Sequence, residues 1–262
     1  MHFDFFKYQG TGNDFVLINN HKLSFPKENH ALVRQICDRR FGIGADGLML
    51  LEEAEGMDFK MVYYNSDGNE STMCGNGGRC ICAFAAHLGI VERSGQFIAI
   101  DGPHEFSIEG DIVKLKMIDV PAIRKEMGFE GENYELFTGS PHFVSFRENI
   151  AHLDIVSEAK KIRYSQLYAK AGINVNFMEV KEGKIKMRTY ERGVEDETLS
   201  CGTGTVAVAL CFAETNNLEK GTVDIQTPGG DLSVSFEKKG AVYTNVWLEG
   251  PAKLVFTGTI EV

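Results

Sequence analysis

Two cysteines stand in matching contexts, Cys74 within CGNG and Cys201 within CGTG. Each motif comes directly before a stretch with the apolar spacing of a helix, so we expect both thiols at the start of a helix. The first backbone N–H groups of a helix have no partner inside it and lie at the positive end of its dipole, which favours a thiolate. The glycines also let a substrate carboxylate approach these N–H groups closely. Each motif is therefore a candidate acid/base site.

A pair of such thiols can invert a carbon centre. A thiolate on one face removes an α-proton, and a thiol on the opposite face delivers a new one. One cysteine must be charged and the other neutral, so the two should titrate as a coupled unit. The fixed dipoles of the two helix ends would stabilise the carbanion without a metal or an electron-sink cofactor. The pattern predicts a cofactor-independent amino-acid racemase or epimerase with no metal site.

The other four of the six cysteines lie within helical patterns and are expected to be small buried side chains, which is the usual place of a free cysteine. They are Cys37, Cys80, Cys82 and Cys211. A zinc site is disfavoured because paired Cys-x2-Cys spacing and a nearby histidine are both missing from the sequence. The lack of a Cys-x-x-Cys motif equally disfavours a thiol–disulfide oxidoreductase.

The elements around the two cysteines form an internal repeat. The step along the chain from Cys74 to Cys201 equals the step from Asn13 to Ser140, which lie in the related segments TGNDFV and TGSPHFV. The segments KMVYYN and KMRTYE repeat with nearly the same step. One long repeat indicates two duplicated domains, whose shared cleft is a common place for a ligand. The boundary is expected within residues 119–137, which lack a clean period.

The rest of each half is typical of short strands around one or two helices. Alternating apolar residues predict strands and hairpins over 105–117, 231–250 and 252–262. Cap signals at both ends predict a helix over 24–42. The run 206–213 is apolar on every side, which indicates a buried helix. We therefore predict an α+β fold of two pseudo-symmetric domains, each a strongly curved, mostly antiparallel sheet wrapped around a central helix.

Composition limits the partners. The chain has 262 residues and a net charge of −10, a field that would repel a phosphate backbone, so nucleic acid is not an expected partner. The first residues lack the pattern of a signal peptide, and no apolar stretch approaches the roughly 18 residues of a membrane span. We expect a cytoplasmic protein that does not bind membranes.

Several further motifs accompany the cysteines: GTGNDF, FGIGADG, NSDGNE, SPH and YERG. In this order and spacing, from about residue 10 to about residue 205, the chain resembles the diaminopimelate epimerase family. The resemblance implies domains of 1–119 with 251–262 and of 120–250, because the last strand returns to the first domain. It also implies a homodimer, no cofactor, and interconversion of LL- and meso-2,6-diaminopimelate for lysine and peptidoglycan-precursor synthesis.

The resemblance also implies roles for single residues. Cys74 and Cys201 correspond to the acid/base pair, and His142 and Glu191 to groups that set the protonation of the thiols. The remaining positions correspond to substrate contacts. They are Gly75, Asn76, Gly202 and Thr203 around the α-carboxylate, and Asn13, Asn65, Asn174, Glu191 and Arg192 along the substrate, with Arg192 on the distal carboxylate.

Two departures and two rivals bear on the substrate. Ser140 stands where family members often have asparagine, and Gly47 where some have glutamine. A proline racemase or 4-hydroxyproline epimerase uses the same two-cysteine mechanism. Its substrate lacks a distal charged group, so Arg192 would have no substrate carboxylate to bind. A non-catalytic amino-acid-binding module on this fold is the alternative from another class, and the presence of both cysteines disfavours it.

Overall fold

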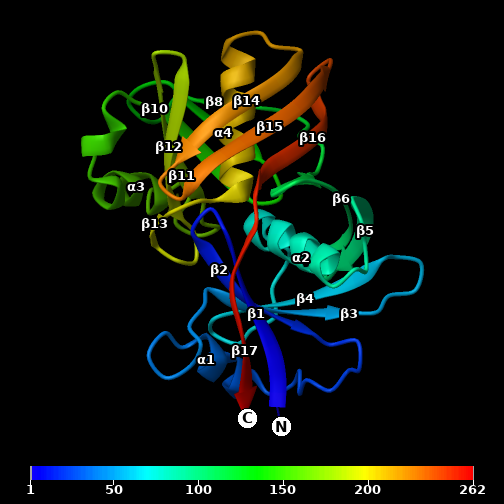
Figure 1. Cartoon of the computed structure of the whole chain (residues 1–262). Coiled ribbons are helices and arrows are strands. Elements are labelled where there is room, and N and C mark those ends of the chain that lie inside the picture. The colour runs from blue at the N-terminus through cyan, green and yellow to red at the C-terminus, as the bar shows by residue number, and fades with distance from the viewer. Residues whose placement is uncertain (1, 262) are drawn as a thin grey trace. The chain divides into compact units, whose positions relative to one another are not determined.

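The structure is a computed structural model that describes residues 2–261, and it contains two compact units (Figure 1). Unit 1 comprises the described residues of Met1–Leu115 and Gly250–Val262, and unit 2 comprises Lys116–Glu249. The last strand, β17, pairs with the first, β1, so the chain ends in the unit where it begins.

Unit 1 is a sheet of eight strands in the order β17-β1-β2-β3-β4-β5-β6-β7. The pairs β2–β3 and β4–β5 are parallel, and the other pairs are antiparallel. Helices α1 and α2 lie in the connections of these two parallel pairs, because parallel neighbours need a crossover. The bounds are β1 (His2–Gly10), β2 (Asn13–Asn19), α1 (His30–Cys37), β3 (Gly47–Glu52), β4 (Phe59–Asn65), α2 (Gly75–His87), β5 (Ser94–Ala99), β6 (Gly102–Glu109), β7 (Ile112–Lys116) and β17 (Lys253–Glu261).

Unit 2 has the order β8-β9-β10-β11-β12-β14-β15-β16, with β13 paired beside β12. Here β10–β11 and β12–β14 are the parallel pairs, and α3 and α4 lie in their connections. The bounds are β8 (Arg124–Glu126), β9 (Asn133–Phe137), β10 (Pro141–Phe146), η1 (Ile150–His152), α3 (Ile155–Arg163), β11 (Asn174–Lys181), β12 (Lys184–Glu191), β13 (Asp196–Thr198), α4 (Gly202–Thr215), β14 (Lys220–Thr227), β15 (Gly230–Lys239) and β16 (Val242–Pro251).

The two units repeat the same topology. Strands β1 to β7 of unit 1 correspond in order and pairing to β9, β10, β11, β12, β14, β15 and β16 of unit 2, and β17 corresponds to β8. The ladders agree residue by residue: Phe15 pairs with Gly47 as His142 pairs with Asn174, at the same step along the chain that separates the two cysteine motifs. The repeat in the sequence is therefore a repeat of structure, and the predicted α+β class is confirmed.

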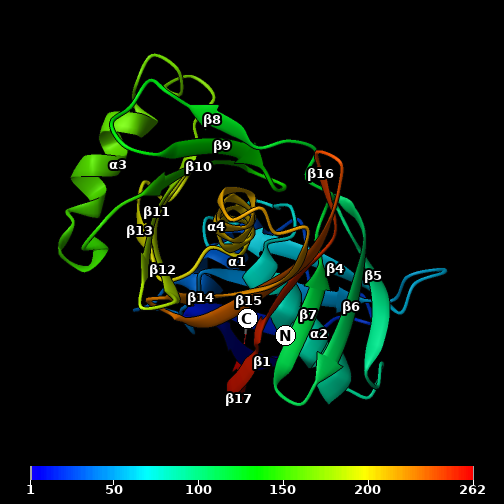
Figure 2. The same cartoon turned by 90° about the horizontal axis from the view of Figure 1, so that it is seen from above.

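Helix α4 is the centre of unit 2. Figure 2 shows it nearly end-on, with the strands of unit 2 curving around it. The side chains of residues 206–211 are all 0% exposed and pack against apolar residues of β9–β12 and β14–β16, so the helix predicted to be buried on every side is found buried. Within residues 2–261, no helix is both long and apolar enough to span a membrane.

Helix α1 is shorter than the sequence predicts. The cap signals predict a helix over 24–42, but α1 covers only His30–Cys37. Asn29 is the N-cap, and its side chain accepts a hydrogen bond from the backbone N–H of Leu32. Asp38 ends the helix in an extended conformation, and its carboxylate accepts from the N–H groups of residues 40 and 41. These local hydrogen bonds compete with continuation of the helix at both ends.

Candidate active site

Cys74 is the N-cap residue of α2, in an extended conformation with φ −103° and ψ 146°. Its Sγ accepts a hydrogen bond from the backbone N–H of Gly77 at 3.2 Å, and its side chain is half-buried. A Cβ at Gly77 would collide with Met49 and lie 3.1 Å from this sulfur. The glycine is therefore needed for the sulfur to lie against the first turn of the helix.

Cys201 has the equivalent place as the N-cap residue of α4, with φ −126° and ψ 113°. Its side chain is 7% exposed, and its Sγ lies 3.6 Å from Oγ1 of Thr203. A Cβ at Gly204 would lie 3.3 Å from this sulfur and closer still to the side chain of Asn176. Both glycines that follow the cysteines by three residues thus leave room for sulfur at a helix start.

A buried polar chain connects His142 to Cys201. His142, on β10, is 0% exposed, and its Nε2 lies 2.9 Å from Oγ1 of Thr203. The amide of Asn176 donates to Nδ1 of His142 and to the carbonyl of Phe143, while its oxygen accepts from Thr189. An amide N–H can only donate, so this network assigns the imidazole proton to Nε2, which donates to Thr203.

The imidazole of His142 is neutral. Burial, together with the nearby positive charge of Arg192, lowers its pKa from 6.5 to about 3. His142 therefore acts on Thr203 as a neutral hydrogen-bond donor. The Thr203 hydroxyl can accept from a thiol at Cys201 or donate to a thiolate there, so this contact can serve both protonation states.

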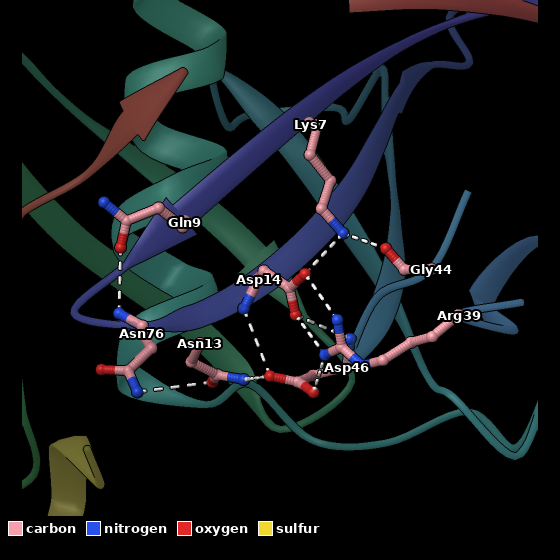
Figure 3. Close-up of polar contacts among 9 residues, drawn as sticks. Lys7, Gln9, Asn13, Asp14, Arg39, Gly44, Asp46 and Asn76 are labelled. Atoms are coloured by element: carbon pink, nitrogen blue, oxygen red, sulfur yellow. Dashed lines mark hydrogen bonds and ion pairs between the residues drawn. The ribbon is translucent and has the colours of Figure 1, made fainter. Parts of the chain in front are cut away.

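Asn13 lies against Asn76, which follows Cys74 by two residues at the start of α2. The Asn76 side chain is 3% exposed and donates from Nδ2 to Oδ1 of Asn13 at 3.3 Å (Figure 3). Asn13 in turn donates to the carboxylate of Asp46 at 2.5 Å. Two residues predicted to bind substrate are therefore brought together and oriented by neighbours in unit 1. A third, Asn65, ends β4 opposite Gly47 of β3.

An ion-pair network behind Asn13 was not predicted. Arg39 bridges Asp14 and Asp46, with N–O distances of 2.7 Å to each, and Lys7 lies 2.6 Å from Asp14 (Figure 3). Burial alone would raise the pKa of Asp14, but the hydrogen bonds and charges of Arg39 and Lys7 lower it to about 2. The network holds the carboxylate that orients Asn13. Both aspartates lie in motifs of the sequence, but nothing in the local pattern indicated their cationic partners.

In unit 2, Asn174 holds the segment that carries Arg192. Its Nδ2 donates to Oγ of Ser140 at 2.8 Å, and its Oδ1 accepts from the backbone N–H of Arg192 at 2.9 Å. Ser140, the departure noted in the sequence, is thus part of this contact. The Arg192 side chain is exposed and donates to the carbonyl of Ala171, and Glu191 accepts from the hydroxyl of Thr198.

Two further buried polar residues near the cysteines were not predicted from the sequence. Asn176 follows Asn174 by two residues along β11, with the apolar Val175 between them. Residues two apart in a strand point to the same face, so this spacing could have indicated that the two asparagines share a polar face. Arg79 is 0% exposed within α2, and it is the one charged residue between Cys74 and Ala86. A lone charge in an otherwise apolar helix was the available signal.

Comparisons with known proteins match both halves of the chain. The model of the diaminopimelate epimerase family matches residues 5–118 and 136–255, one segment in each half. The chain is 52% identical over 257 residues to diaminopimelate epimerase of Flavobacterium psychrophilum, covering 97% of this chain and 99% of that protein.

Solved structures with much lower sequence identity share the fold. A phenazine biosynthesis protein of the PhzF family from Bacillus anthracis has a TM-score of 0.77 at 14% identity, with 100% of both chains covered. A hydroxyproline epimerase from Agrobacterium vitis has a TM-score of 0.71 at 14% identity, covering 99% of this chain and 92% of that one. At these identities the likeness is one of fold alone.

Proposed function

The chain belongs to the diaminopimelate epimerase family, isomerases of lysine biosynthesis, and on that premise we propose that Cys74 and Cys201 invert an α-carbon of 2,6-diaminopimelate between them. The observation that carries the proposal is the matched placement of the two thiols, each an N-cap in an equivalent element of a repeated unit. A helix start favours a thiolate and offers N–H groups to an anion, which are the two requirements of this reaction.

The reaction is a proton relay. The thiolate of one cysteine takes the α-hydrogen as a proton, so an S–H bond forms and the C–H bond breaks. The electron pair left on carbon delocalises into the α-carboxylate. The thiol of the other cysteine then gives its proton to the opposite face of the carbon and becomes a thiolate. No electrons are lost and no net proton is taken up, but the two thiols exchange protonation states.

The α-carboxylate needs fixed donors, because charge develops on it in the transition state. We assign this role to the backbone N–H groups at the starts of α2 and α4, at Gly75, Asn76, Gly202 and Thr203. The side chains of Asn76 and Thr203 each contact a neighbouring side chain of the same unit, Asn13 in unit 1 and His142 in unit 2. The donors are thus set before substrate arrives.

The distal end of the substrate carries a second carboxylate and a second ammonium. Arg192 is the group proposed for the carboxylate, because a guanidinium binds it with two parallel hydrogen bonds. Its exposed side chain is available, and its backbone is fixed by Asn174. The ammonium groups need oxygen acceptors, and suitable ones are the side-chain oxygens of Asn13, Asn65, Asn174 and Glu191. We assign to His142 and Glu191 the role of setting the protonation of the two thiols.

A side-by-side isomerisation assay tests the function. The purified protein is expected to interconvert LL- and meso-diaminopimelate, to exchange the α-hydrogen in deuterated water, and to leave L-proline and 4-hydroxyproline unchanged. Turnover of proline but not of diaminopimelate would establish that the protein is a proline racemase. Tight binding of diaminopimelate with no exchange would establish a non-catalytic binding module.

We also propose that the protein works in the cytoplasm as a homodimer. All six cysteines lie within residues 2–261, and no disulfide joins any of them there, as expected in a reducing compartment. Light scattering after size-exclusion chromatography measures the assembly, and a single-chain mass of 29.1 kDa in solution would contradict the dimer.

A further inference from the structure

Arg79 is a buried charge that the proposed mechanism does not use. It lies in the second turn of α2 and is among the largest fully buried side chains of residues 2–261. Its guanidinium donates to Oγ1 of Thr11 at 3.1 Å, to Oδ1 of Asn76 at 3.0 Å and to the carbonyl of Gly75 at 3.3 Å. Its Nε is buried without a hydrogen-bond partner among the described residues. Such a charge is costly to bury unless an anion compensates it.

No carboxylate of the described residues pairs with Arg79. The oxygens that accept from Arg79 are neutral, and no ion pair within residues 2–261 joins Arg79 to an acidic side chain. Burial lowers the pKa of Arg79 to about 10, so it is still protonated at neutral pH, and the groups whose negative charge favours its protonated form are Cys80 and Cys74. Burial raises the pKa of Cys80 far above neutrality, so Cys80 is a neutral thiol. Of these two thiols, Cys74 is the one at the helix start, where the guanidinium contacts the neighbouring residues Gly75 and Asn76.

We propose that Arg79 is a positioning residue that stabilises the thiolate of Cys74, so that Cys74 rather than Cys201 carries the charge of the pair in the resting enzyme. The proposal rests on the proposed function and adds to it which of the two cysteines is the thiolate before substrate binds. Arg79 acts through Cys74 and also holds Asn76, so it sets both the base and a carboxylate donor at one helix start.

The equivalent position in unit 2 supports this asymmetry. Val206 follows Cys201 at the same spacing as Arg79 follows Cys74, in the same turn of α4, and is a fully buried apolar side chain. Cys201 is 7% exposed and has the hydroxyl of Thr203 beside it. The cation of unit 2 that acts on His142 is Arg192, whose exposed charge is screened by solvent. A charge in the protein interior interacts more strongly than an exposed one.

The other charges around α2 are compensated among themselves. Asp14 is paired with Lys7 and Arg39, and Asp101, which accepts from the backbone N–H of residue 73, lies 3.2 Å from His104. Each of these carboxylates faces a cationic or titratable partner of its own. Arg79 differs from them, because it is a buried cation near Cys74 whose described contacts include no carboxylate.

The test measures how readily each thiol ionises, without substrate. In a Cys201→Ala background, the rate at which iodoacetamide alkylates Cys74 is followed against pH by peptide mass spectrometry. Arg79→Met is expected to raise the midpoint by about one pH unit or more and to slow alkylation at neutral pH about tenfold. Arg79→Lys keeps the charge and should keep most of the rate. Val206→Ala is the matched control at the equivalent position and should leave the midpoint of Cys74 unchanged.

Two results would overturn the proposal. The first is a folded Arg79→Met variant, verified by circular dichroism, with the parent midpoint for Cys74, or an Arg79→Lys variant shifted as far as Arg79→Met. The second needs no change at Arg79: the midpoint of Cys74 in Cys201→Ala must lie below that of Cys201 in Cys74→Ala, and the reverse order contradicts the proposal even if Arg79→Met does not fold. Because titration requires no turnover, these outcomes are separate from a failure of the proposed epimerisation.

Discussion

The two units have one topology but different polar interiors beneath their cysteines. Equivalent positions of the repeat differ in kind: Met49 against Asn176, and Phe15 against His142. In unit 1 the ring of Phe15 packs edge-on against Tyr63, whereas in unit 2 the imidazole of His142 reaches Cys201 through a hydroxyl.

The charges differ as well. Unit 1 has a buried guanidinium under its helix start, and unit 2 has Val206 there. The repeated backbone fixes where each sulfur lies, because the N-cap position and the glycine three residues later recur in both halves. The side chains at equivalent positions then decide how each sulfur is charged. A two-base reaction needs both features: similar geometry on the two sides and opposite protonation.

Removal of either thiol is the largest expected effect. If the two units contribute equal halves of one relay, Cys74→Ala and Cys201→Ala should each lower epimerisation of diaminopimelate by at least about 10³-fold, within the range that a general acid or base contributes. The assay follows the LL and meso forms by chiral chromatography. Near-normal turnover by one variant would mean that only one unit supplies chemistry.

Mild oxidation tests whether the two sulfur atoms are close enough to act on one substrate carbon. Peroxide should convert one thiolate to a sulfenic acid, which the second thiol then attacks, with loss of water and formation of a Cys74–Cys201 disulfide. Activity should fall almost completely and return with a thiol reductant, and peptide mapping identifies the cross-link. Inactivation without that cross-link would contradict a shared substrate carbon, because a disulfide requires closely spaced cysteines.

The next prediction concerns Arg192, the group of unit 2 proposed to bind the distal carboxylate. Arg192→Ala should lower kcat/KM for diaminopimelate about 10- to 100-fold, as expected for loss of hydrogen bonds to a charged group. Arg124→Ala, which removes an exposed arginine of the same unit, is the control and should change kcat/KM little. An equal loss with an amino acid that lacks a distal carboxylate would show that Arg192 does not select the substrate.

The last prediction concerns the stability of the protein rather than its turnover, and it depends on His142. Its pKa is near 6.5 in the unfolded chain and about 3 when buried, so the unfolded state binds the extra proton between these values. The free energy of unfolding should therefore fall as pH drops below about 6.5, by up to about 1.4 kcal/mol per pH unit. His142→Phe, which introduces the side chain of its counterpart Phe15, should remove this slope between pH 6.5 and about 5, above the range in which Asp14 contributes, as measured by urea unfolding at several pH values. A slope that persists in the variant would assign the acid sensitivity to other groups.

Much of the molecule follows from local patterns. The matched cysteine motifs and the all-apolar run of α4 were visible in the sequence because helix starts and burial leave a signal within a few neighbouring residues. The long internal repeat was visible because duplication makes such local signals recur at one fixed step. The same signals predicted the α+β class. The predicted length of α1 was wrong, because the side chains of Asn29 and Asp38 bind nearby backbone N–H groups. The helix therefore starts later and ends earlier than the cap signals indicate.

The sequence by itself determined which residues could exchange a proton and that they come as a pair. The tertiary structure decided what surrounds them: His142 meets Thr203 from a strand 61 residues away, and Arg79 meets Thr11 across 68 residues. Burial and such long-range contacts set the charge of a side chain, and no spacing rule encodes them, because they depend on which elements the fold packs together.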